Sequence, residues 1–361
     1  MSEHLQRQPF GRLADGTEVE AITLRNAHGL TARILTYGGI VARLETPDRT
    51  GKIHNIVLGF DSLDAYRRSP HYIGPLIGRY ANRIAGGRFM LDGNVYQVPI
   101  NLPPNALHGG TQGFNAAVWT VERATDADQP SVTLSHISPD GDQGFPGQLV
   151  VQARFVLTAD TLRLEFTATT VRATVLNLTS HWYFNLAGPG ADDILQHELL
   201  IPAEAFLPAD ATLIPTGEIR SVADTPFDFR KPMQIGARIN GADEQIAIAN
   251  GYDHSFLLPG SAEGRAALAA RVHEPDSGRV MEVWTTEPSV HFYSGNSLDS
   301  SDAGTGGRAY KPRDGFCLET QHYPDAPNHP HFPSTVLRSG ETYRSRTEFR
   351  FSTDGTNVRR Y

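Results

Sequence analysis

The acidic residue Glu319, near the C-terminal end of the chain, stands out because of its neighbours. It follows Phe316, Cys317 and Leu318 in an apolar run that ends in a proline-containing turn. In a β-strand, alternate side chains point to opposite faces, so Glu319 would share a face with Cys317. A carboxylate beside a small thiol can be partly desolvated, which suits a general base. The alternative is a rim charge or half of a structural ion pair, and the local residues alone favour that alternative.

Two histidines lie where an imidazole could reach a ligand. His108 directly precedes a glycine pair, so the backbone can bend and turn the ring into a cleft. His181 lies in a run with Trp182, Tyr183 and Phe184, and partial burial near a carboxylate could tune it as a proton donor near neutral pH. The aromatic rings could also stack on a sugar. Either histidine could instead be an ordinary hydrogen-bonded residue of the core.

Other polar side chains could hold hydroxyl groups. Asn82 and Arg83 lie in a glycine-flanked segment and are hydrogen-bond donors. Asp253 offers two carboxylate oxygens to a pair of vicinal hydroxyls. In a strand its neighbour His254 would face the other way, so we expect Asp253 in the site and His254 outside it. His291, in a second aromatic segment, is a similar candidate. Each could equally belong to a solvated turn or an ordinary strand.

Other chemistries have weaker support in the sequence. The group His322, His329 and His331 lacks the close spacing of zinc ligands, so we expect no metal site there. The glycine-rich segment 109–113 follows no βαβ pattern, which argues against a phosphate-binding loop. Cys317 as a nucleophile would need a positioned histidine, and no neighbouring residue supplies one.

Composition limits the partners and the compartment. The net charge of -8 and a pI near 5.9 provide no basic field for nucleic acid, so a neutral or weakly charged small ligand fits better. A single cysteine excludes an internal disulfide, and the first residues contain no apolar signal core. No apolar stretch approaches the length of a membrane span. We therefore expect a soluble, cytoplasmic protein with no membrane partner.

Strand patterns recur along the whole chain, whereas helical periodicity is scarce. Apolar and polar residues alternate in four segments, at 30–35, 151–157, 162–168 and 343–351. The four-residue link between the second and third segments suits an antiparallel hairpin. The best helical candidate is a turn or two from Ser62 to Arg67, with Ser62 as its cap.

The distribution of turn residues predicts the architecture. The 34 glycines and 24 prolines are spread along the 361 residues, and no stretch stands out as a linker between domains. Many strands, short turns and little helix favour an all-β fold, a single large antiparallel β-sandwich or barrel that spans residues 1–361. Residues 1–9 are expected to be a flexible N-terminal segment. A ligand would bind on the concave face.

Taken together, the polar segments resemble the aldose 1-epimerase, or galactose mutarotase, family in their order and nearly in their residues. The similarity extends from about Phe10 to Phe351. It is carried by GRYANRIAGGRF at 78–89, PNALHGG at 104–110, SHWYFNLAG at 180–188, GYDHSF at 251–256, HFYSGN at 291–296 and LETQHYPDAPN at 318–328.

The resemblance implies a fold, an activity and a set of roles. The fold would be the galactose mutarotase-like supersandwich, with no metal and no cofactor. Glu319 matches the general base and His181 the general acid of ring opening. The resemblance assigns sugar binding to Asn82, Arg83, His108, Asp253 and His291. Family members usually have Gln at the last of these positions, which leaves the preferred aldose open.

The implied function is the interconversion of the α and β anomers of free aldoses such as glucose or galactose. An ionised Glu319 and a protonated His181 would supply the chemistry. The partner would be a small aldose, and the protein a monomer or homodimer. Three alternatives remain: a hexose-phosphate 1-epimerase using Arg79 and Arg88, a non-catalytic carbohydrate-binding protein, and a glycoside hydrolase with Asp253 and Glu319 as its carboxylates.

Overall fold

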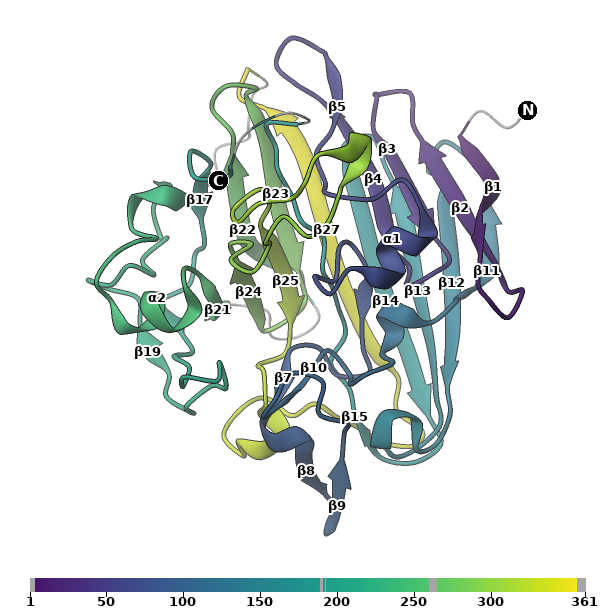
Figure 1. Ribbon diagram of the computed structural model, residues 1–361, viewed down its shortest axis with the longest axis vertical. Helices are drawn as coiled ribbons and strands as arrows, with labels where there is room; N and C mark the ends of the chain where they lie inside the picture. The colour runs from purple at the N-terminus through teal and green to yellow at the C-terminus, as the bar shows by residue number, and fades with distance from the viewer. Residues whose placement is uncertain (1–3, 189–190, 192, 260–264, 356–361) are drawn as a thin grey trace.

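Strands far outnumber helices in the computed structural model, which describes residues 4–188, 191, 193–259 and 265–355. Three larger sheets of antiparallel strands make up the molecule (Figure 1). Apolar residues of all three contribute to one continuous core, so the two smaller sheets pack against the largest. The predicted all-β sandwich is confirmed.

The sheets are ordered as follows. The nine-stranded sheet contains β11 (Thr120–Thr125), β12 (Ser131–Ser138), β13 (Leu149–Leu157), β14 (Thr161–Thr170), β27 (Tyr343–Thr353), β23 (Arg279–Thr285), β22 (Ala267–His273), β17 (Glu198–Leu200) and β20 (Met233–Gln234). An N-terminal sheet contains β1 (Leu5–Arg12), β2 (Glu18–Arg25), β3 (Thr31–Leu35), β4 (Val41–Pro47) and β5 (Ile53–Asn55). A third sheet contains β19 (Arg220–Ser221), β18 (Ala205–Phe206), β21 (Asp253–Leu257), β24 (Ser289–Tyr293) and β25 (Cys317–Gln321).

Shorter elements surround these sheets. Four two-stranded pairs are β6 (Leu76–Ile77) with β16 (Thr179–Ser180), β7 (Arg83–Ile84) with β10 (Ala106–Leu107), β8 (Arg88–Leu91) with β9 (Asn94–Gln97), and β15 (Thr174–Val175) with β26 (Val336–Leu337). The α-helices of the described residues are α1 (Leu63–Arg68) and α2 (Glu244–Ala249). Single 3-10 turns are η1 (Ala85–Gly87), η2 (Phe114–Ala116), η3 (Asp142–Gly144), η4 (Ile235–Ala237), η6 (Thr305–Gly307) and η7 (Ala326–Asn328).

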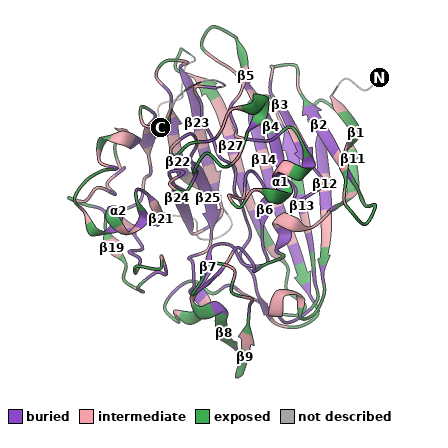
Figure 2. Ribbon diagram, viewed as in Figure 1, coloured by how far each residue is buried: buried purple, intermediate pink, exposed green. Residues whose placement is uncertain are grey.

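The alternating segments form strands as predicted. The hairpin expected around residues 158–161 is β13–β14, in which Leu157 lies opposite Leu162. Their apolar side chains face the core, and the polar ones face solvent (Figure 2). Helix α1 begins after Ser62, whose hydroxyl oxygen accepts the N–H of Ala65, so the predicted cap is also confirmed.

The expected flexible N-terminal segment is wrong from Leu5 onward. Residues Leu5–Arg12 form β1, which pairs with β2 along its length. Main-chain hydrogen bonds to a neighbouring strand order this segment, although none of its residues is buried, and its sequence carries little apolar pattern. Residues 1–3 of the expected segment lie outside the described residues.

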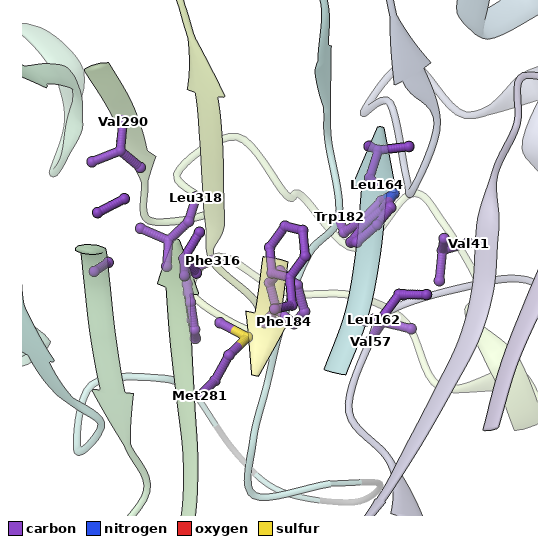
Figure 3. Packing of buried hydrophobic residues seen from close by; sticks show 14 of the residues in the cluster. Val41, Val57, Leu162, Leu164, Trp182, Phe184, Met281, Val290, Phe316 and Leu318 are labelled. Carbon is purple, nitrogen blue, oxygen red and sulfur yellow. The ribbon is translucent and has the colours of Figure 1, made fainter. Parts of the chain in front are cut away.

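The third sheet separates the core from the polar site. Val290 and Leu318, on neighbouring strands β24 and β25, point into the apolar cluster with Phe316 and Phe184 (Figure 3). Because strand side chains alternate, the residues next to them point to the other face of the sheet. Among the described residues, no helix has the length and apolar character needed to cross a bilayer.

Candidate active site

All seven polar residues singled out in the sequence line one cavity of about 270 Å³: Asn82, Arg83, His108, His181, Asp253, His291 and Glu319. The volume lies near the lower limit of small-molecule pockets, about 300 Å³, and suits a ligand of monosaccharide size. A cavity of about 850 Å³ lies beside it and shares Tyr72 with it. The smaller one is the candidate site because the titratable groups converge there.

Neighbouring strands of the third sheet supply the acidic side of the cavity. Glu319 in β25 lies directly opposite His291 in β24, and His291 lies opposite Ser255 in β21. Cys317 is buried on the same face as Glu319, as the alternation predicts. His254 faces away, where its Nε2 contacts Gln245, so its expected place outside the site is confirmed.

Two left-handed residues bring the opposite side of the cavity together. Asn82 and His108 have φ values of 63° and 51°, a conformation that costs about 1–3 kcal/mol and is common at functional sites. The His108 N–H donates to the Asn82 carbonyl at 2.9 Å, and the Asn82 N–H donates to His108 Nδ1 at 3.1 Å. Gly109 allows the turn because a Cβ there would lie 2.3 Å from the Gly78 oxygen.

The hydrogen bond to His108 defines what its ring offers the cavity. Because Nδ1 accepts the Asn82 N–H, the hydrogen of the neutral ring lies on Nε2. His108, His181 and Glu319 are the group of described residues whose ligand atoms, within 4.8 Å of one another, could surround a metal ion. An Nε2–H group presents no lone pair to a metal, and it suits a sugar hydroxyl oxygen better.

The His181–Glu319 pair is close but loosely held. His181 Nε2 lies 3.7 Å from Glu319 Oε1, and the two side chains are 6% and 2% exposed. Glu319 Oε2 has no hydrogen-bond partner among the described residues. His181 Nδ1 lies 3.5 Å from Cys317 Sγ. At 3.7 Å the two groups do not hydrogen-bond to each other, and both line the cavity, where a ligand could contact them.

Burial keeps this pair neutral. Desolvation, reinforced by the negative charge of Asp253, raises the pKa of Glu319 well above its usual range. Desolvation also lowers the pKa of His181 to about 4. Burial therefore favours the neutral form of each group, because it penalises both charges. The ionised Glu319 and protonated His181 expected from the sequence stay a prediction.

Asp253 has the opposite environment. Arg83 Nη2 donates to Oδ2 at 3.2 Å, and His291 Nε2 lies 2.6 Å from Oδ1. Burial alone would raise the pKa of Asp253, but the charge of Arg83 and the hydrogen bond from His291 lower it below its usual range. Asp253 is therefore a buried carboxylate that stays ionised.

The comparisons with known proteins agree over nearly the whole chain. The family model for aldose 1-epimerase matches residues 20–350. The chain belongs to the aldose 1-epimerase family. It is 46% identical to galactose mutarotase from Bos taurus, over 96% of this chain and 98% of that protein. It is 36% identical to aldose 1-epimerase from Escherichia coli strain K12, over 93% and 96% of the two chains. A crystal structure of the GalM/aldose epimerase homologue from C. elegans superposes with a TM-score of 0.84 at 33% identity, covering 92% of this chain and 98% of that one.

This member of the aldose 1-epimerase family also has cavity residues that sequence reasoning missed. Tyr72 contacts the rings of both His108 and His181, with centroids 4.7 and 6.0 Å away. Its φ of 51° is unusual for an aromatic residue, and the sequence around it contains only a Ser-Pro signal for a turn. Ser255 was missed because it lies behind His291, outside the cavity lining.

Proposed function

We propose that this chain interconverts the α and β anomers of free aldoses such as glucose or galactose, with Glu319 as general base and His181 as general acid. The observation that supports it best is the pair itself. Burial raises the pKa of Glu319 and lowers the pKa of His181. Both groups line a cavity of monosaccharide size, and they do not hydrogen-bond to each other, so each can contact a ligand. We likewise propose that the protein is cytoplasmic and works as a monomer or homodimer.

The reaction needs only two proton transfers. Glu319, as the carboxylate, takes the proton from the C1 hydroxyl while the His181 imidazolium gives one to the ring oxygen. The C1–O5 bond breaks, C1 becomes an aldehyde, and rotation about C1–C2 presents its other face to the C5 hydroxyl. During ring closure Glu319 gives its proton to the C1 oxygen, which becomes a hydroxyl again. At the same time the C5 hydroxyl gives its proton to His181. Each transfer contributes about 10²- to 10⁴-fold.

The neutral forms of Glu319 and His181 are the forms that this cycle requires once the ring is open. After ring opening, Glu319 holds the proton from the C1 hydroxyl and His181 is neutral, and burial favours the neutral form of each group. The bound cyclic sugar needs the charged state, so a proton must first pass from Glu319 to His181. Hydrogen bonds from the sugar stabilise the carboxylate formed. Burial therefore favours the proton transfers that open the ring.

The remaining cavity residues hold the sugar while its C1 end turns. Asp253, fixed by Arg83, can accept hydrogen bonds from hydroxyls away from C1. The Nε2–H of His108 can donate to a hydroxyl oxygen. The amide of Asn82 lies at the same end of the cavity. Holding one end of the ring leaves the reacting end free to rotate.

The structure weakens the phosphate alternative. Arg79, one of the two arginines that such an enzyme would use, is 2% exposed, and its guanidinium donates to the carbonyls of Pro146 and Gly147 at 2.8 and 2.7 Å. It therefore holds a loop and is not available to a phosphate. Arg88 lies in β8 and is not among the residues that line the cavity. Of the arginines of the described residues, Arg83 alone lines it, and Asp253 already neutralises that charge.

A glycoside hydrolase is also disfavoured. Each oxygen of Asp253 already accepts a hydrogen bond from a protein side chain, so Asp253 is poorly placed to act as a second reacting carboxylate. A non-catalytic carbohydrate-binding protein would have no need for a buried, unsatisfied Glu319 beside a neutral histidine, because an unpaired buried carboxyl group costs stability.

Polarimetry tests the proposal. Freshly dissolved pure α-glucose and α-galactose should equilibrate faster with the wild-type protein, and Glu319→Gln should return the rate to near background. Glu165→Gln, the same change on the solvent-facing side of β14, serves as the matched control and should keep wild-type activity. A wild-type protein that accelerates no free aldose would overturn the proposal. Acceleration of α-glucose 6-phosphate alone would favour the phosphate epimerase.

A further inference from the structure

His291 is held by two residues of the neighbouring strand. Asp253 and Ser255, two positions apart on β21, point to the same face, and His291 on β24 lies between their side chains. His291 Nε2 lies 2.6 Å from Asp253 Oδ1, and His291 Nδ1 lies 2.8 Å from Ser255 Oγ. His291 and Ser255 are 3% and 2% exposed. Both ring nitrogens are therefore occupied by protein groups and are not free for a sugar.

We propose that His291 and Ser255 are positioning residues of the sugar site, in which the Ser255 hydroxyl binds Nδ1 of His291 and so holds the ring where it donates to Asp253. This inference rests on the proposed function, since Asp253 is the carboxylate that holds the sugar. It assigns a role to Ser255, and it replaces direct sugar binding by His291 with an action through Asp253.

The chemistry of the three groups determines the direction of the hydrogen bonds. An ionised Asp253 can only accept, so Nε2 of His291 must carry a hydrogen. A neutral imidazole has one N–H, so Nδ1 is then an acceptor and the Ser255 hydroxyl donates to it. Asp253 therefore sets the tautomer, and the Ser255 hydroxyl supplies the partner of Nδ1. Without that hydroxyl, Nδ1 would be a buried acceptor that has lost its donor, and the ring would be held by Asp253 alone.

Steady-state kinetics with α-galactose and α-glucose, measured between pH 5.5 and 8.5, supply the first test. Ser255→Ala should raise KM about two- to tenfold with kcat largely kept. Ser255→Thr keeps a hydroxyl and should restore the wild-type KM. If Ser255 acts through the His291 ring, adding Ser255→Ala to His291→Gln should raise KM by less than it does in the wild-type protein.

Nitrogen-15 NMR of the histidine rings supplies a readout that does not depend on activity. The His291 signals, assigned by their loss in His291→Gln, should report hydrogen on Nε2 in the wild type and in Ser255→Ala, and the Nδ1 signal should shift in Ser255→Ala because that nitrogen loses its hydrogen-bond donor. An unchanged Nδ1 signal together with an unchanged KM in Ser255→Ala would overturn the inference. A wild-type protein without epimerase activity would count against the proposed function, while the NMR signals would still decide whether Ser255 donates to His291. Thermal unfolding checks that each variant is folded.

Discussion

Two buried pairs of a carboxyl group and a histidine lie in the same cavity and have opposite properties. In the first, Glu319 and His181 are 3.7 Å apart, one carboxyl oxygen has no described partner, and burial shifts both pKa values toward the neutral forms. In the second, Asp253 and His291 are 2.6 Å apart, and Arg83 adds a positive charge that keeps the carboxylate ionised.

The comparison shows that hydrogen-bond partners, more than burial, determine which carboxyl group suits which task. The side chains of Glu319 and Asp253 are 2% and 12% exposed, so desolvation acts on each. Asp253 has two donors that offset this cost, which makes it a fixed anchor for hydroxyl groups. Glu319 has none, so its proton affinity stays high and changes readily when a ligand arrives. A base that must gain and lose a proton benefits from that lack of partners.

The largest expected effect follows from Glu319→Gln. The amide cannot accept a proton from the C1 hydroxyl, so kcat should fall by about 10²- to 10⁴-fold in polarimetric assays, with a smaller change in KM. Stability should behave differently. Because the folded-state pKa of Glu319 is raised, the carboxyl group destabilises the fold above the pKa of the unfolded chain, near 4.3. The variant should therefore be at least as stable as the wild type at pH 7 in urea unfolding.

The second change, Asp253→Asn, should lower stability and raise KM more than Glu319→Gln does, and it should lower kcat less. It leaves the buried guanidinium of Arg83 without its ionised partner, and breaking such a pair costs about 3 kcal/mol. We expect a lower urea midpoint, a KM raised by about tenfold or more and a smaller loss of kcat. The lowered pKa of Asp253 means that its contribution to stability is present at neutral pH and is lost as the pH falls. Equal stability losses in this variant and in Glu319→Gln would refute the distinction between the two pairs.

The pH dependence of kcat/KM is the third test, because it reports the free enzyme. The active pair carries one proton. It gains a second as the pH falls through the pKa of His181, about 4, and loses its only proton as the pH rises through the raised pKa of Glu319. Activity should therefore fall about tenfold per pH unit below about pH 4, and a second fall should occur on the alkaline side. An acid limb near pH 6.5, the ordinary pKa of histidine, would contradict the assigned resting state.

The sequence predicted much of the fold because its signals are local. Alternation along residues 151–168 and the cap at Ser62 both depend on near neighbours in the chain. The face assignments of Asp253 and His254 were also predictable, since alternation within one strand determines them. The strand at Leu5–Arg12 was missed because an edge strand is ordered by main-chain bonds that leave little apolar pattern.

The sequence could not predict which partner each charged group would find. Arg79 and Arg83 are four positions apart in one glycine-flanked segment, yet one holds a loop and the other pairs with Asp253. The pKa shifts of Glu319 and His181 could not be predicted, because they depend on burial created by distant segments. Ser255 was missed for the same reason, since its partner lies on another strand.

The smallest expected effect concerns Cys317, which lies behind the looser pair. Its thiol is 3.5 Å from Nδ1 of His181, and burial raises the pKa of the thiol well above its usual range, so it stays a neutral, weak donor. Removing it in Cys317→Ala should lower kcat by less than about tenfold and stability by about 1 kcal/mol, through the lost contact and a small cavity. Cys317→Ser offers a stronger donor of similar size and should keep more activity than the alanine variant. If alanine abolished polarimetric activity as fully as Glu319→Gln, His181 would need a firmly held partner, and the free, adjustable character assigned to this pair would be wrong.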